Sequence, residues 1–254
     1  MKLFDAHCHL QDERIGNDVD AIIERARTAG VDRMLCCGSS ENDWDAVLEL
    51  AEKYQFVIPA LGIHPWYVDG RSKQWLQRLS YCIEKNPHIA IGEIGLDHVI
   101  SPRNDKEQFT ILQQQLTLAR EYNRSTSVHC RKAWGSLMNF LRQNPSYGVN
   151  MVIHSYSGPV ELIDELYDYG IYFSFSGSVT YERNKRGREA LKKVPADRLL
   201  IETDSPDILP CNCSGTNEPA HLQQIVQTVA AIRGTNAESI AELTYKNGSR
   251  LFSG

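Results

Sequence analysis

Eight apolar segments alternate with amphipathic segments along the chain, and this alternation limits the possible folds more than any other feature. The apolar segments are residues 2–7, 31–38, 56–64, 88–95, 125–130, 148–155, 170–177 and 198–205. Between them, apolar side chains recur with helical spacing; within 105–122 they are Phe109, Leu112, Leu116 and Ala119. Strands that are apolar throughout and separated by such helices indicate a parallel sheet covered by helices.

The number of strand–helix units selects among parallel-sheet folds. Eight units in 254 residues fit a closed (β/α)₈ barrel better than an open doubly wound sheet. No G-x-G-x-x-G follows a strand segment and no G-x-x-x-x-G-K-[ST] occurs, so the nucleotide-binding open sheets lack their usual marker. Because no linker or repeat interrupts the pattern, we expect residues 1–254 to form a single-domain α/β TIM barrel.

Composition and charge limit the class of protein, its expected location and the partners it can bind. The chain is 42% hydrophobic and 23% charged, as in globular proteins with a sizeable core, and no apolar run approaches the length of a membrane span. No basic region followed by an apolar stretch opens the chain, so we expect a cytoplasmic protein without membrane contact. The net charge of −5 argues against a high-affinity duplex binder, although bound cations can supply local positive charge.

The seven cysteines do not predict a disulfide framework. Their number is odd, they are scattered, and several lie in apolar strand-like segments, where thiols behave as small hydrophobic groups. Cys211 and Cys213 form a C-x-C pair that could bind metal, but no partner pair lies nearby, and buried thiols that behave as small hydrophobic groups are the simpler account.

Polar side chains stand at the carboxyl ends of six of the eight apolar segments. One such histidine is commonly structural, and one such carboxylate commonly caps the next helix. Six together, at the end of a barrel where catalytic groups collect, are a much stronger signal. These residues are His7, His9, His64, Glu93, His129, His154 and Asp204.

Imidazoles and carboxylates of this kind form the mixed ligand set that suits Zn²⁺, Mn²⁺ or a similar ion. His7 and His9 are two residues apart, so on a strand they project to the same face. With Glu93, His129, His154 and Asp204 they make six candidate ligands, more than a tetrahedral site holds. The sequence therefore predicts a two-metal centre, with Glu93 as the carboxylate that bridges the two ions.

The motifs around these residues resemble the TatD family of metal-dependent deoxyribonucleases, which belong to the amidohydrolase-like metallo-hydrolases. The matching stretches are DAHCHL (5–10), GIHP (62–65), IGEIGLD (91–97), VHCR (128–131), IHSYSG (153–158), FSFSG (173–177), IETDSP (201–206) and NEP (217–219). The resemblance implies hydrolysis of DNA phosphodiester bonds, here expected as 3′–5′ exonuclease action on single-stranded ends. It also implies two divalent ions (Mg²⁺, Mn²⁺ or Zn²⁺), held by His7, His9, Glu93, His129, His154 and Asp204.

Three departures from the family pattern lie at the rim of the expected pocket. His98 stands where the family commonly has Tyr, and Cys130, Arg131 and Lys132 stand where it commonly has Ser followed by Arg-Asp. The loop after the last strand carries CNCSGT (211–216). These changes spare the metal ligands and leave the substrate open.

We expect the remaining polar residues to assist the metals. Asp204 is the candidate acceptor of a proton from water, and Arg131 is the candidate phosphate contact. His64 either contacts a phosphate or the leaving group, or orients its neighbours. Asp5 and Glu202 share strand faces with the ligands, and we expect them to fix imidazole tautomers.

Two alternatives to a nuclease remain. A hydrolase on the same barrel can act on a small ester, lactone, amide or phosphotriester, but many such enzymes bridge their metals with a carboxylated Lys, and residues 86–105 contain none. A non-enzymatic role is the second, and the complete ligand set argues against it. We expect a DNA substrate, no organic cofactor and a monomer.

Overall fold

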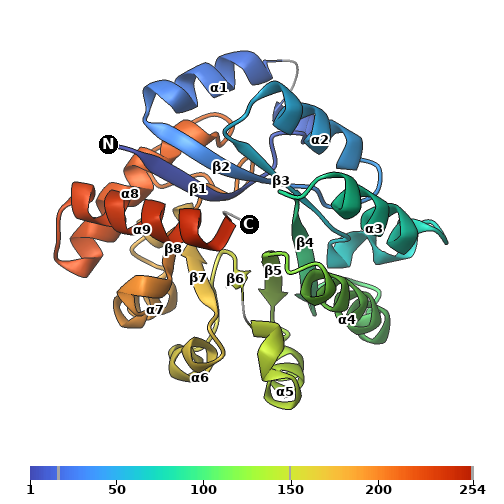
Figure 1. Ribbon diagram of the computed structural model, residues 1–254. Coiled ribbons are helices and arrows are strands. Elements are labelled where there is room, and N and C mark those ends of the chain that lie inside the picture. The colour runs from blue at the N-terminus through green and yellow to red at the C-terminus, as the bar shows by residue number, and fades with distance from the viewer. Residues whose placement is uncertain (16–17, 149, 253–254) are drawn as a thin grey trace.

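The eight predicted strands form one parallel, nearly closed barrel (Figure 1). The computed structural model describes residues 1–15, 18–148 and 150–252. Strands are hydrogen-bonded in chain order from β1 to β8, and each predicted apolar segment overlaps one of them. The strands are β1 (Leu3–Cys8), β2 (Val31–Cys37), β3 (Val57–Leu61), β4 (Ala90–Asp97), β5 (Thr126–Arg131), β6 (Met151–Ile153), β7 (Tyr172–Phe175) and β8 (Leu199–Ile201). The predicted α/β barrel is therefore confirmed.

The seam between β1 and β8 is made by backbone bonds just beyond the strand ends. The His9 N–H donates to the Ser205 carbonyl at 2.7 Å, and the Asp204 N–H donates to the His7 carbonyl at 2.9 Å. Three of the predicted metal ligands thus also join the first and last strands of the barrel.

Helices cover the outside of the barrel between successive strands (Figure 1). The predicted helix 105–122 is α4 (Asp105–Glu121). The other covering helices are α1 (Val19–Thr28), α2 (Trp44–Lys53), α3 (Trp75–Lys85), α5 (Trp134–Gln143), α6 (Ile163–Asp168), α7 (Lys185–Lys193) and α8 (Leu222–Arg233). None of the described helices has the length and hydropathy needed to cross a membrane.

A further helix, α9 (Ala237–Phe252), lies across the amino-terminal end of the barrel, which faces the viewer in Figure 1. The Phe252 ring stacks on Phe4 of β1 at 5.9 Å, and Asn247 donates to the backbone carbonyl of Leu199 at the start of β8. Apolar side chains fill the barrel interior above it, including Leu35, Ile58, Val152 and Leu200. Within the described part of the chain, α9 and these side chains cover the amino-terminal end, and the pocket that contains the polar groups lies at the carboxyl ends of the strands.

The last predicted strands end earlier than the sequence indicates. Segments 148–155 and 198–205 yield only β6 and β8, three residues each, and residue 149 lies outside the described part of the chain. Ser155 (φ 42°) and Asp204 (φ 56°) adopt the left-handed conformation, which non-glycine residues rarely take and which ends a strand. The bends place both residues at the carboxyl end of the barrel, among the polar groups.

Candidate metal centre

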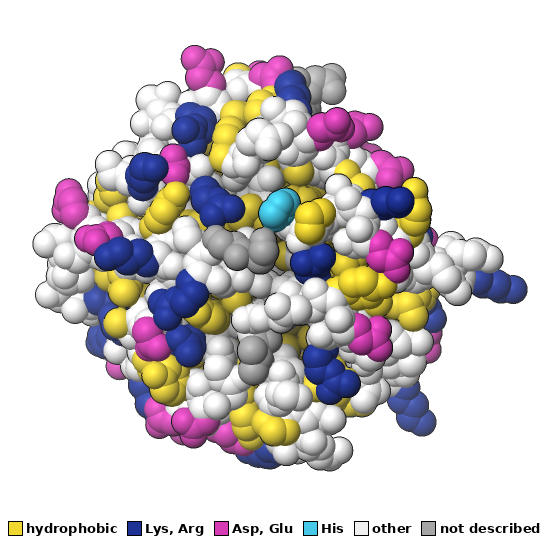
Figure 2. Space-filling model, viewed as in Figure 1, with side chains coloured by type: hydrophobic (Ala, Val, Ile, Leu, Met, Phe, Trp, Pro, Cys, Tyr) yellow, Lys and Arg dark blue, Asp and Glu magenta, His cyan; other side chains and the backbone are white. Residues whose placement is uncertain are grey.

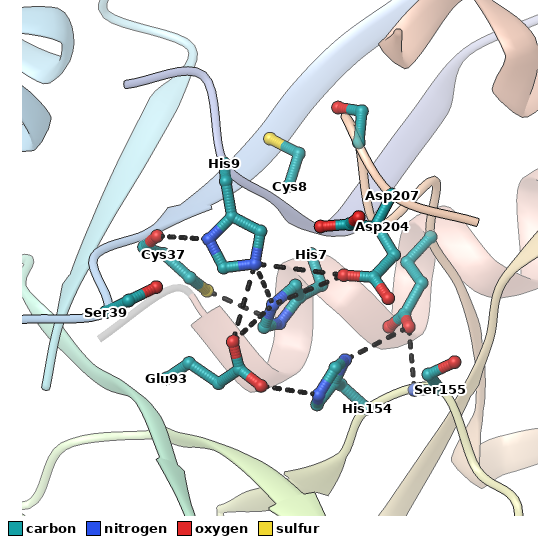
Figure 3. Close-up of polar contacts among 12 residues, drawn as sticks. His7, Cys8, His9, Cys37, Ser39, Glu93, His154, Ser155, Asp204 and Asp207 are labelled. Carbon is teal, nitrogen blue, oxygen red and sulfur yellow. Dashed lines mark hydrogen bonds and ion pairs between the residues drawn. The ribbon is translucent and has the colours of Figure 1, made fainter. Parts of the chain in front are cut away.

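Six of the seven polar residues predicted from the strand ends line one pocket at the carboxyl end of the barrel, and the seventh, His7, is fully buried beside His9 and Asp204. Figure 3 shows Glu93 between the His7 and His9 rings on one side and the His154 ring on the other, with Asp204 beyond His9. Only His129 is partly exposed, and the others are buried. Their nitrogen and oxygen atoms form two groups around Glu93.

The first group brings two imidazoles and two carboxylates together. The Nε2 atoms of His7 and His9 lie 3.1 Å apart, and Glu93 Oε2 lies 3.5 and 3.4 Å from them. Asp204 Oδ1 lies 3.9 and 3.8 Å from the same two nitrogens.

The second group forms around the other oxygen of Glu93. Oε1 lies 3.0 Å from His129 Nδ1 and 2.8 Å from His154 Nε2, and these nitrogens are 3.2 Å apart. His64 Nε2 lies 3.3 Å from the same oxygen, so His64 belongs to this group as well as to the pocket wall. Each oxygen of Glu93 therefore faces its own set of nitrogens.

Close backbone contact between β4 and β5 helps to position the side chains of Glu93 and His129. Gly95 in β4 has φ 149°, and a Cβ there would lie 2.0 Å from the carbonyl oxygen of His129 on β5. Only glycine accommodates both the conformation and the contact. The Glu93 backbone N–H donates to the Gly38 carbonyl at 2.7 Å, which fixes the chain at the bridging residue.

These donors fit divalent ions. Two ligands of one ion with bonds of about 2.0–2.1 Å lie roughly 3.0–3.4 Å apart, close to most separations within each group. His9 Nδ1 lies 2.7 Å from the Cys37 carbonyl, which can only accept, so Nδ1 carries the proton and the Nε2 lone pair faces the pocket. His7 Nδ1 contacts the Ser127 hydroxyl at 2.9 Å. The residues present can therefore hold divalent metal.

Burial and neighbouring charges set the protonation of the cluster. Burial lowers the pKa of His7 to about 4, which keeps its ring in the neutral form that binds metal. At Glu93 the surrounding imidazoles outweigh burial and hold the pKa well below its ordinary value. Glu93 and Glu202 outweigh burial at His154 and raise its pKa, so an ion bound there would replace a proton. Burial raises the pKa of Asp204 to about 6.

A second shell of residues orients the imidazoles, and sequence reasoning found only part of it. Glu202 Oε1 lies 3.4 Å from His154 Nδ1 and accepts the Ser155 N–H at 2.7 Å, the position expected for it. Asp97 was missed: its Oδ2 lies 3.3 Å from His129 Nε2 and accepts the Trp66 indole N–H at 2.8 Å. The available signal was its place at the end of the β4 segment.

The expectation for Asp5 was wrong. Its carboxylate accepts the Thr203 hydroxyl at 2.5 Å and the Thr203 backbone N–H at 2.8 Å, and it contacts the backbone rather than the ring of His7. The alternation of β1 is irregular between Asp5 and Cys8, so Asp5 does not share the orientation of the imidazoles. Asp5 supports the loop that carries Asp204 instead.

The pocket above the two groups has a volume of about 470 Å³, within the range of small-ligand sites. Arg131 lies at its rim with an exposed side chain, as the phosphate prediction requires, and its Nη1 lies 4.0 Å from Asp97 Oδ2. Trp66, Tyr67 and Tyr156 add aromatic surface to the wall.

Comparison with known proteins shows the family. The family model described as TatD related DNase matches residues 4–253. The chain belongs to this family. The TatD resemblance drawn from the motifs is therefore confirmed, and the chain is a metal-dependent hydrolase.

Individual TatD relatives match along nearly their full length. An uncharacterized metal-dependent hydrolase, YabD of Bacillus subtilis, is 32% identical over 98% of both chains. The 3′-5′ ssDNA/RNA exonuclease TatD of Erwinia tasmaniensis is 32% identical over 98% of this chain and 99% of its own. The crystal structure of YjjV, a TatD homologue of Escherichia coli K12, superposes with a TM-score of 0.92 at 29% identity, covering 99% of this chain and 98% of that one.

Proposed function

We propose that this TatD-family hydrolase cleaves phosphodiester bonds at the ends of single-stranded DNA with a two-metal centre. The observation that carries the proposal is the position of Glu93, whose two oxygens face two separate sets of nitrogen donors. A carboxylate placed in this way can bridge two ions. The exonuclease name of the Erwinia tasmaniensis relative supports the choice of a nucleic-acid end as substrate.

The proposal assigns a role to each group of ligands. His7, His9, Glu93 and Asp204 would hold one ion, and Glu93, His129 and His154 would hold the other. Divalent ions in such sites lower the pKa of water and offset the negative charge that builds on a phosphoryl group.

The side chains of the protein then bind the substrate and move the proton. Asp204 lies at the edge of the first group, farther from the His7 and His9 nitrogens than Glu93 does. A carboxylate that binds an ion through one oxygen can accept a proton from water on the other, and this is the role we assign to Asp204. Arg131 at the rim would pair with a phosphate. His64, held 3.3 Å from Glu93, would donate to a phosphate oxygen or position Glu93.

The test uses metal-free protein resupplied with Mg²⁺, Mn²⁺ or Zn²⁺ and offered single-stranded oligonucleotides labelled at the 3′ or 5′ end. We expect stepwise shortening from the 3′ end. The Glu93→Gln variant keeps the shape of the side chain but removes its charge, and we expect its rate to fall by at least about 100-fold. Tyr81→Ala, on an exposed position of α3, is the matched control.

Full activity in folded Glu93→Gln protein would contradict the two-metal assignment. A parallel panel of esters, lactones and amides tests the alternative substrates. Turnover of that panel with intact oligonucleotides would reject the nuclease.

A further inference from the structure

Two exposed aromatic side chains flank the candidate metal centre. Trp66 is 53% exposed and Tyr67 is 47% exposed, and both line the pocket that holds the metal ligands. Exposed aromatic surface beside a pocket is typical of a ligand contact, because large apolar groups are otherwise buried. Neither residue has a role in the metal chemistry proposed above.

Trp66 is fixed along one edge and open elsewhere. Its indole N–H donates to Asp97 Oδ2 at 2.8 Å, and its ring meets His64 edge-to-face, with centroids 5.0 Å apart and planes at 89°. Its backbone N–H donates to His64 Nδ1 at 3.1 Å, at the start of the 3₁₀-helix Pro65–Gly70. A ring held in this way loses little freedom when a ligand binds.

The ligand that best matches a rigid aromatic ring beside a metal centre and an arginine is a nucleotide. Every nucleobase has a π-face that stacks on Trp or Tyr, and this contact needs no particular base sequence. Arg131 lines the same pocket and can pair with the adjoining phosphate.

We propose that Trp66, with Tyr67 beside it, is a stacking platform for the nucleobase next to the phosphate that is cleaved. The inference rests on the proposed nuclease function and adds the part of the substrate that the pocket wall recognises. Bases inside a duplex are already stacked and paired, so only an unpaired base at a strand end can reach the platform. The platform would therefore favour single-stranded ends over duplex ends as substrates.

The test measures binding to the metal-loaded enzyme. The probe is an internally labelled single-stranded oligonucleotide with phosphorothioate linkages, compared with the same oligonucleotide carrying abasic residues at both ends. We expect Trp66→Ala to weaken binding of the first probe by about 10-fold or more and to leave binding of the abasic probe nearly unchanged. Circular dichroism confirms that the variant is folded.

Two further variants separate stacking from support of Asp97. Trp66→Phe keeps an aromatic face but loses the N–H that Asp97 accepts, and we expect its affinity to stay within about 3-fold of the wild type. Tyr81→Ala removes an aromatic ring that is 60% exposed but lies on α3, outside the pocket, and we expect no change.

Three outcomes would overturn the platform. The first is unchanged binding by Trp66→Ala. The second is an equal loss of affinity for the base-containing and the abasic probe, and the third is an equal loss of affinity in Trp66→Ala and Trp66→Phe. The second and third outcomes would mean that Trp66 acts through Asp97. If the wild type neither binds nor cleaves oligonucleotides, the nuclease proposal fails together with the platform. If the wild type cleaves them and Trp66→Ala behaves as wild type, the platform alone fails.

Discussion

At the scale of single residues, each imidazole of the centre depends on the partner of its far nitrogen. His129 has Asp97 at Nε2, His9 has the Cys37 carbonyl at Nδ1, and His7 has the Ser127 hydroxyl. Such partners fix the tautomer and the direction of the lone pair, and their loss typically weakens metal binding.

Asp97→Asn tests this dependence. Asparagine keeps the shape of Asp97 but removes the charge that faces His129, so we expect affinity for one of the two ions to fall by about 10- to 100-fold while the other is retained. Calorimetric titration of the metal-free protein measures the affinities of the two proposed sites. Asp45→Asn, an exposed carboxylate on α2, serves as the control. Two unaltered affinities in Asp97→Asn would show that His129 does not need this contact.

The sequence predicted the residues that carry the donor atoms better than the residues that orient them. The candidate ligands follow apolar runs of a barrel strand, and this place in the chain was enough to predict that they lie together. The orienting partners come from neighbouring strands, and one is a backbone carbonyl, which has no residue-type signature. Asp5 was misjudged because strict alternation does not hold across an irregular strand.

At the scale of elements, the apolar runs predicted the strands but not where they stop. Chain direction changes at Ser155 and Asp204 through positive φ angles, which an apolar pattern does not reveal. The sequence also did not predict that α9 covers the amino-terminal end of the barrel. Helical periodicity shows that a helix has an apolar face but not which surface this face covers.

The contact between α9 and β1 gives a prediction on stability. A Cβ on Gly248 would lie 2.7 Å from the Phe4 ring, which is buried and stacked on Phe252. We expect Gly248→Ala to lower the free energy of unfolding by about 1–3 kcal/mol, since the gain in helix propensity is smaller than the cost of overpacking. Urea unfolding provides the measurement.

Gly135→Ala is the matched control for this change. Gly135 also lies in a helix, but a Cβ added there would meet no other segment within 4 Å, so we expect the stability of this variant to stay level or rise slightly. An equal change in the free energy of unfolding for the two substitutions would show that the close contact between Gly248 and Phe4 does not affect stability.

At the scale of the whole molecule, the net negative charge bears on how an anionic substrate would be bound. The net charge is −5, and the amino-terminal face in Figure 2 mixes basic, acidic and apolar side chains rather than presenting one basic surface. A nucleic-acid substrate, as proposed above, would be attracted chiefly through bound cations and rim residues such as Arg131.

Metal binding should also stabilise the folded chain as a whole. The candidate ligands come from segments spread along the chain, from the first strand to the loop after the last one. They meet only in the folded state, so ions would bind the native form preferentially. When the free metal concentration is 100-fold above the dissociation constant, we expect the free energy of unfolding to rise by about 2.7 kcal/mol. This corresponds to a rise in Tm of roughly 5–10 °C. Differential scanning calorimetry with and without Mn²⁺ measures it. A shift of the same size in Glu93→Gln would place the stabilising ion elsewhere.

The seam between β1 and β8 has a consequence for how the protein is made. His7 and His9 are synthesised nearly 200 residues before Asp204, whose backbone N–H donates to the His7 carbonyl. Glu93, His129 and His154 are all available some fifty residues sooner. The donors of the second group are therefore all synthesised before Asp204, and the group that contains Asp204 can be completed only once the last strand has joined the first.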